Sequence, residues 1–88
     1  MKTPKQLERY FKGAANHRRI AILCTVGKNK GITVQMLAGM LGANIKTISQ
    51  HTHSLMRAGL LHKQYRGRQV AHYLSPYGKL FLKFMTTF

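Results

Sequence analysis

The side chains best suited to chemistry in this chain are clustered between positions 46 and 57. They are amide, hydroxyl, imidazole and cationic groups with no carboxylate among them: Lys46, Thr47, Ser49, Gln50, His53 and Arg57. A glutamine amide can form two hydrogen bonds to the edge of an adenine, and a lysine can reach guanine acceptors or a phosphate. A basic helix can also be merely solvated, but this combination of side chains predicts contacts to nucleic acid.

A second cluster lies at a predicted hairpin turn. Residues 61–65 and 69–74 are expected to form two strands, and Gly67 supplies the positive φ that a tight turn between them requires. Arg66 and Arg68 flank this glycine, and Gln69 follows. Arginines at such a tip can contact phosphates or enter a narrow minor groove. The hairpin is therefore a second candidate contact to nucleic acid.

The net charge indicates the same kind of partner. The chain has 88 residues, with fifteen Lys and Arg against one acidic residue, Glu8, and a formal charge of +14. Hydrolysis by paired acids, a triad acid or a magnesium cage requires more carboxylates, so we expect no enzyme. Cations without internal partners repel one another, and a polyanion relieves that repulsion.

Metal and cofactor chemistry is not indicated. His51 and His53 lie two positions apart on a predicted helix and point in different directions, whereas His62 and His72 could be neighbours across the hairpin. For the second pair, hydrogen-bonded sheet histidines are the commoner arrangement. Cys24, the single cysteine, lies on an apolar helix face, where a core role is commoner than a redox role. We expect no metal and no cofactor.

The overall composition predicts one globular domain spanning residues 1–88. Hydrophobic residues make up 44% of the chain, which is enough for a core. No apolar run approaches the length of a membrane span, and the first residues lack the apolar region of a signal peptide. We therefore expect a cytoplasmic location, with no membrane partner.

The elements that must position these residues are mostly helical. Caps and apolar spacing predict helices over residues 4–12 and 17–26 and a turn over residues 27–31. Thr3 and Pro4 are favourable residues for a helix start, and Gly13 is expected to break the first helix. A helix-turn-helix is predicted over residues 33–58, because Gly42 can end one helix and Asn44 can cap the next.

The second helix of this motif, over residues 45–58, has a predicted inner face. Ile45, Ile48, Thr52 and Leu55 share that face by helical spacing. The polar side chains listed first above are therefore expected to face outward or to flank the core. Met36, Met40 and Met56 are expected to pack within the motif.

The last helix, predicted over residues 76–88, carries a large apolar stripe. The stripe could close the core of one chain, or it could pair with the first helix of a second chain. Six large apolar residues exceed what a small core absorbs, and an exposed patch of that size is unusual in a monomer. We therefore expect a homodimer through Leu7, Tyr10, Phe11, Tyr77, Leu80, Phe81, Phe84 and Met85.

The order of elements is that of a winged helix-turn-helix, and the residues resemble the ArsR-type transcriptional repressors. The matching segments are ANHRRIAIL at 15–23, ITVQMLAGMLGANIKTISQHTHSLMRAGLL at 32–61 and YRGRQVAHYL at 65–74. Positions that match family motifs are Arg19, Ile22, Leu23, Leu37, Ala38, Leu41, Gly42, Thr47, Ser49, His51, Leu55, Ala58, Gly59, Leu60, Gly67, Arg68, Tyr73 and Leu74. The resemblance covers most of the chain and implies a DNA-binding role in a prokaryotic cytoplasm or nucleoid.

Some departures limit what the resemblance implies. Asn16 and His17 stand where the family has a proline or its neighbours, and Thr52 replaces a core leucine. Metal-sensing members carry a C-V-C pair in the helix that here begins after Thr33, or Asp and His ligands on the last helix. This chain has neither set, so metal sensing is not carried over.

The sequence therefore predicts a mainly α protein with a small β-hairpin, a winged helix-turn-helix of about five helices and a two-stranded wing over residues 61–74. The expected function is sequence-specific binding of double-stranded DNA by a dimeric transcriptional repressor at an inverted repeat. Two alternatives keep the fold: an architectural protein that coats DNA through its charge, and an RNA-binding winged helix.

Overall fold

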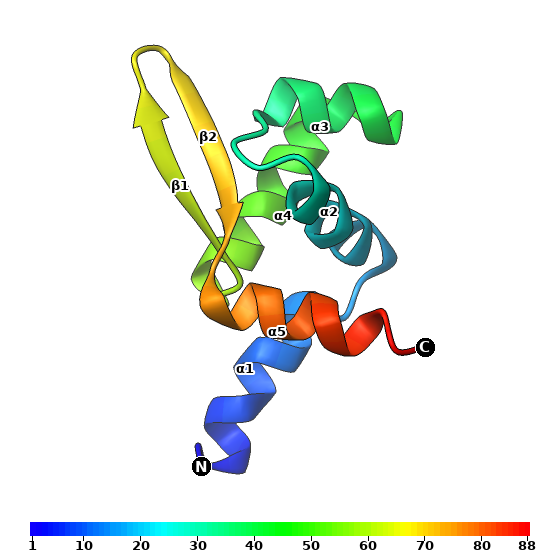
Figure 1. Ribbon diagram of the computed structural model, residues 1–88, viewed down its shortest axis with the longest axis vertical. Helices are drawn as coiled ribbons and strands as arrows, with labels where there is room; N and C mark the ends of the chain where they lie inside the picture. Colours follow the sequence, from blue (N-terminus) through cyan, green and yellow to red (C-terminus); the bar gives the residue numbers. More distant parts are fainter.

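Each helix of the chain begins where a polar side chain caps it. The computed structural model describes residues 1–88 and contains five helices and one antiparallel hairpin (Figure 1). The elements are α1 (Pro4–Ala14), α2 (His17–Lys28), α3 (Val34–Leu41), α4 (Ile45–Arg57), β1 (Leu61–Arg66), β2 (Gln69–Leu74) and α5 (Pro76–Met85). The caps accept hydrogen bonds from backbone N–H groups in the first turn, and they are Thr3, Asn16, Thr33, Asn44 and Ser75.

Two glycines that were expected to end helices lie inside them instead. Helix α1 continues through Gly13 to Ala14. Glycine is needed at position 13 because a Cβ there would overlap the Cβ of Ala58 at the end of α4. Helix α2 continues through Gly27, where a Cβ would lie 2.5 Å from Cδ2 of Leu82 in α5. Both helices therefore end two residues later than predicted, and the turn predicted over residues 27–31 begins only at Asn29. The two glycines allow helices to pack closely.

The helix-turn-helix forms as the sequence predicts. Gly42 has a φ of 61° and ends α3, and Gly59 has a φ of 82° just beyond α4. The inner face of α4 consists of Ile48, Thr52 and Leu55, which are fully buried or nearly so. Met36 and Met40 on α3 are exposed, at 57% and 58%, so the expectation that they pack within the motif is wrong for these two.

The hairpin has the predicted turn and one additional partner. Arg66 pairs with Gln69 across the turn, and only Gly67 between the strands has a positive φ, of 63°. At its other end, the hairpin pairs with Ile32 in the α2–α3 connection. Two backbone hydrogen bonds of 3.0 Å, from His72 N to Ile32 O and from Gly31 N to His72 O, join the wing to the helical body.

The core lies where α2 meets α3, α4 and the base of the hairpin. Its largest fully buried side chains include Ile22, Leu23, Leu37, Ile48 and Leu55. Helices α1 and α5 lie together at the end of the molecule opposite the wing tip and α3 (Figure 1). Helix α5 ends at Met85, three residues earlier than predicted. No helix combines the length and apolar character needed to cross a membrane.

Candidate nucleic-acid interface

One face of α4 is polar and open. Lys46, Gln50, His53 and Arg57 recur at intervals of three or four residues and are all exposed, so they share one side of the helix. Thr47 and Ser49 beside them are half-buried. The face is positively charged at both ends and can donate and accept hydrogen bonds between them.

One residue at the start of this face is exposed although its position in the sequence predicted burial. Ile45 was expected to face inward, but it is 52% exposed at the first position of α4, next to Lys46. Ile45 is the first residue of α4, and burial on the inner face begins only at Ile48. Helical spacing therefore extended the inner face by one residue too many. Ile45 thus adds an apolar group to a surface that is otherwise polar.

Helix α4 is fixed in orientation by its opposite side. The guanidinium of Arg19 in α2 donates to Nδ1 of His51 at 3.2 Å and to the Gly13 carbonyl at 3.2 Å, which links α1, α2 and α4. Burial, followed by the charge of Arg19, lowers the pKa of His51, so the imidazole stays neutral as an acceptor. The hydroxyl of Thr52 donates to the Ser49 carbonyl at 2.8 Å, which satisfies this buried polar side chain.

The two arginines of the wing differ in how they are held. Arg66 donates to the Tyr73 hydroxyl at 2.6 Å, and its guanidinium lies 5.9 Å from the centre of the Tyr73 ring. Arg68 is exposed at the turn and lines a shallow groove with Gln69 and the first residues of α3, from Thr33 to Met36. Arg68 is thus free to extend to a ligand, whereas Arg66 would first leave Tyr73.

A further cationic surface continues from the end of α4. Arg57 shares a shallow groove with Arg9 and Lys12 of α1 and with Arg19. The only ion pair of the chain joins Lys12 to Glu8 at 3.5 Å on exposed side chains. Arg9, Arg19 and Arg57 lack an acidic partner, so three of the four cations that line this groove are not neutralised internally.

The remaining histidines and the cysteine do not form a cluster. His62 pairs with Tyr73 and His72 with Lys63, which places the two imidazoles on opposite faces of the hairpin, so they are not the neighbours that the sequence allowed. Nδ1 of His72 lies 3.0 Å from the Ile32 carbonyl, and the ring is buried. No three His, Cys, Asp or Glu side chains gather in a way that could hold a metal ion. Cys24 is partly buried.

The terminal helices expose an apolar surface next to the core. Phe11 and Phe81 pack edge to face at 5.2 Å, and together with Leu80 and Phe84 they line an apolar groove of about 200 Å³. Leu80 and Phe84 are 61% and 56% exposed. Tyr10, expected at a dimer contact, is buried and packs on Tyr77 at 5.1 Å, so it belongs mainly to the core of one chain. Leu7 and Met85 are half-buried.

This architecture defines the class: the chain is a winged helix-turn-helix domain, as predicted. The sequence matches no family model and none of the curated proteins.

Solved structures similar to this chain include transcriptional regulators and a possible member of the ArsR family. The chain is 28% identical to HlyU from Vibrio cholerae N16961, with a TM-score of 0.85 over 97% of this chain and 94% of that one. It is 26% identical to HlyU from Vibrio vulnificus CMCP6, with a TM-score of 0.81 over 94% of this chain and 86% of that one.

A third similar structure is the homodimeric winged helix-turn-helix DNA-binding domain of Mb0332 from Mycobacterium bovis. That protein is described as a possible ArsR-family transcriptional regulator. It is 25% identical to this chain, with a TM-score of 0.85 over 94% of this chain and 78% of that one. The resemblance to ArsR-type regulators carried by the sequence motifs therefore extends to the whole fold.

Proposed function

We propose that the chain is a dimeric, sequence-specific double-stranded-DNA-binding transcriptional regulator that acts as a repressor. The observation that carries the proposal is the outward face of α4. Its exposed polar and cationic side chains lie on the second helix of a helix-turn-helix, which is the helix that enters the major groove in this class. HlyU from Vibrio vulnificus is described as a transcriptional regulator and Mb0332 as a possible one, and the similarity of this chain to both supports the assignment.

In this proposal, Lys46, Thr47, Ser49 and Gln50 read base edges from the first turns of α4. Gln50 binds an adenine through its amide, and a good bidentate contact of this kind discriminates between bases by about 1–3 kcal/mol. Ile45 joins this set, because an exposed aliphatic side chain beside the base-reading residues can contact the methyl group of thymine.

The remaining cations hold the phosphate backbone. His53 and Arg57 continue the α4 face, and the groove that Arg57 shares with α1 extends the positive surface beyond the helix. On the wing, Arg68 and Gln69 reach phosphate or the minor groove, and Arg66 joins them when it leaves Tyr73. Each neutralised phosphate releases counterions, so binding weakens steeply with salt.

A second copy of this chain covers the apolar groove on the terminal helices. The exposed Phe11, Leu80 and Phe84 would otherwise present an apolar patch to water, which a monomer rarely tolerates. Mb0332, aligned over most of this chain, is described as homodimeric. A two-fold dimer would present two α4 helices to successive major grooves about 34 Å apart, which predicts an inverted repeat with half-sites about ten base pairs apart.

Selection from a random double-stranded DNA pool at near-physiological salt tests the proposal. We expect enrichment of an inverted repeat with the spacing given above. The formal charge of +14 also suits an architectural protein that coats DNA without sequence preference. Tight binding with no enriched sequence would overturn the proposal in favour of that second function, and preference for structured RNA would favour an RNA-binding role.

A further inference from the structure

A cavity on another side of the molecule has a composition that the proposed DNA contacts do not explain. It measures about 600 Å³ and lies between the end of α2, the base of the hairpin and α5. None of its lining residues belongs to α4 or to the wing tip at 66–69. The volume falls within the range of about 300–1,000 Å³ that is usual for small-molecule sites.

The floor of the cavity is apolar. Val26 and Leu74 are buried in the core, and Leu82 of α5 packs against it. Gly27 allows this approach, because a Cβ there would lie 2.5 Å from Cδ2 of Leu82. A wall of two stacked rings adds flat contact area: the centroids of His62 and Tyr73 are 5.6 Å apart, at an interplanar angle of 19°.

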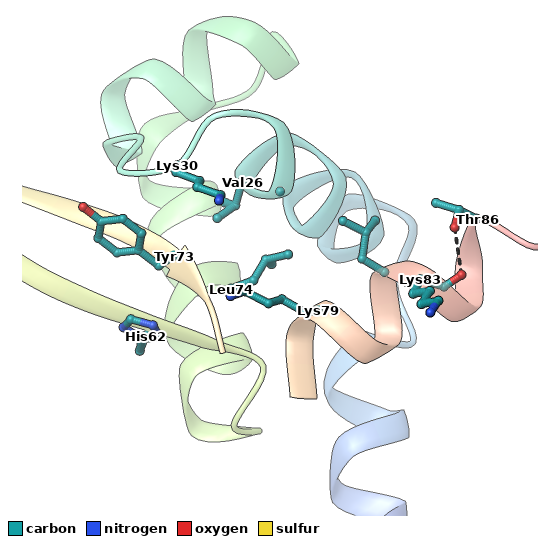
Figure 2. Close-up of a pocket in the computed structure, with 10 residues that line it drawn as sticks. Val26, Lys30, His62, Tyr73, Leu74, Lys79, Lys83 and Thr86 are labelled. Atoms are coloured by element: carbon teal, nitrogen blue, oxygen red, sulfur yellow. Dashed lines mark hydrogen bonds between the residues drawn. The ribbon is translucent and has the colours of Figure 1, made fainter. Parts of the chain in front are cut away.

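The rim of the cavity is cationic. Lys30, Lys79 and Lys83 all line it, and Figure 2 shows Lys30 and Lys79 on opposite sides of Val26 and Leu74. None of the three ammonium groups has an acidic partner, because the only carboxylate side chain, that of Glu8, pairs with Lys12. Three unpaired cations around an apolar floor leave a site that an anion with an apolar body would complete.

The cavity uses a face of α5 distinct from the exposed apolar stripe. Lys79, Leu82, Lys83 and Thr86 follow one another at helical spacing and line the cavity. Leu80 and Phe84 instead line the apolar groove shared with Phe11. The cavity and the apolar groove therefore share no lining residue.

We propose that this cavity binds a small organic anion with an apolar body, such as an aryl sulfonate or an aromatic carboxylate. The anionic group lies between Lys30 and Lys79, and the apolar body rests on Leu82 and the ring of Tyr73, beneath which Val26 and Leu74 belong to the core. This is a binding site separate from the DNA contacts proposed above, and its occupancy can be measured without DNA.

The cavity is also connected to the wing. The Tyr73 ring lines it, and the Tyr73 hydroxyl accepts the hydrogen bond from Arg66 at 2.6 Å. Arg66 can either donate its hydrogen bond to Tyr73 or leave it, and a ligand that packs against Tyr73 changes the equilibrium between these two states. If the proposed function holds, ligand and DNA affinities are therefore coupled, and the coupling is reciprocal.

The test uses anilinonaphthalene sulfonate, an aryl sulfonate whose fluorescence rises on binding, with the full chain and no DNA. We compare the double variant Lys30→Gln/Lys79→Gln with Lys5→Gln/Lys28→Gln, which removes the same charge from exposed positions outside the cavity. We expect the cavity variant to bind the probe about tenfold more weakly, which corresponds to the loss of two partly exposed ion pairs, and the control to bind like the wild type. Circular dichroism confirms that each variant is folded.

Two further probes separate charge from apolar contact. Uncharged phenylnaphthylamine is expected to bind equally to the wild type and the cavity variant, and inorganic phosphate is expected not to displace the sulfonate. If both lysine variants lose the same affinity for the sulfonate, the proposal is overturned, because the overall charge of the protein would then explain the binding. It is also overturned if phosphate competes effectively, or if Phe84→Ser removes the signal while the cavity variant keeps it.

Coupling to DNA is measured separately as the change in duplex affinity on saturation with the sulfonate. A changed affinity in the wild type, absent in the cavity variant, supports communication through Tyr73. An unchanged affinity with normal sulfonate binding overturns the coupling and leaves the site. Failure to bind any duplex would instead be a failure of the proposed function.

Discussion

The contact between Gly13 and Ala58 allows a sharp test of how α1 is held against α4. Helix propensity alone predicts that Gly13→Ala stabilises the protein, since glycine costs about 1 kcal/mol relative to alanine inside a helix. The new Cβ, however, would overlap the Cβ of Ala58 and lie 3.9 Å from Cδ1 of Leu60. Overpacking of a well-packed contact costs about 1–3 kcal/mol, and Gly13 is buried, so the overpacking cost offsets the propensity gain and we expect net destabilisation of up to about 2 kcal/mol.

Gly39 provides a matched control on α3. It is exposed within a helix, and nothing lies within 4 Å of the Cβ that alanine would add. Gly39→Ala is therefore expected to stabilise the protein by about 0.5–1 kcal/mol. Urea unfolding at one fixed protein concentration measures both variants, because dimerisation would make stability depend on concentration.

A double-mutant cycle assigns the effect to this contact. Ala58→Gly removes the opposing Cβ, so Gly13→Ala should cost less in that background, with a coupling energy of about 1–2 kcal/mol. If the two substitutions are additive, or if Gly13→Ala stabilises the protein as much as Gly39→Ala does, the close-packing explanation for the continuous α1 is refuted.

Three other predictions follow from the interface, the dimer and the buried histidine. Gln50→Ala should change base preference by about 1–3 kcal/mol at one position, whereas Arg66→Ala/Arg68→Ala should weaken binding to all duplexes and reduce the salt slope by about 0.9 per phosphate lost; uniform loss in both variants contradicts the groove assignment of α4. Phe84→Ser should shift sedimentation from dimer to monomer, and an unchanged dimer would exclude the apolar groove as the interface. Burial lowers the pKa of His72 below 6.5, against the opposing hydrogen bond to a backbone carbonyl, so the unfolded chain binds more protons. The unfolding free energy should therefore fall as pH drops below about 6.5, and His72→Gln should flatten part of that dependence; an equally steep dependence would show that other groups cause it.

Local signals in the sequence were sufficient for most of the architecture. Caps such as Asn44 and left-handed glycines such as Gly42 and Gly67 act within a few residues, so their effects can be read without tertiary information. The inner face of α4 was also predictable, because burial of Ile48, Thr52 and Leu55 follows helical spacing.

The errors arose where distant segments decide the outcome. Gly13 and Gly27 act as close-packing residues only because Ala58 and Leu82 approach them, and the sequence carries no signal for those partners. The pairing of Ile32 with His72 involves one residue and leaves no periodicity to detect. Spacing also placed Ile45 inward, although this first residue of α4 is exposed and burial begins at Ile48.

In the candidate site, too, local features were predictable and contacts between distant residues were not. Spacing predicted the polar face of α4, but it could not distinguish the two wing arginines. Arg66 is bound by Tyr73, seven positions away across the turn, whereas Arg68 is not. The cavity rimmed by Lys30 and Lys79 was not anticipated, because it needs α5 folded back onto the end of α2.

Two features of the single chain are unfavourable in isolation, and one assembly accounts for both. The chain exposes a positive charge that its single carboxylate cannot offset, and it exposes aromatic side chains on α1 and α5. In Figure 1, α1 and α5 lie opposite the wing tip and α3, so a partner on the terminal helices would leave the wing and the polar face of α4 open. A second copy would cover the aromatic surface, and a duplex would neutralise the charge without competing for the same residues. Because each proposed partner would relieve a different cost, dimerisation and DNA binding are expected to stabilise the fold independently.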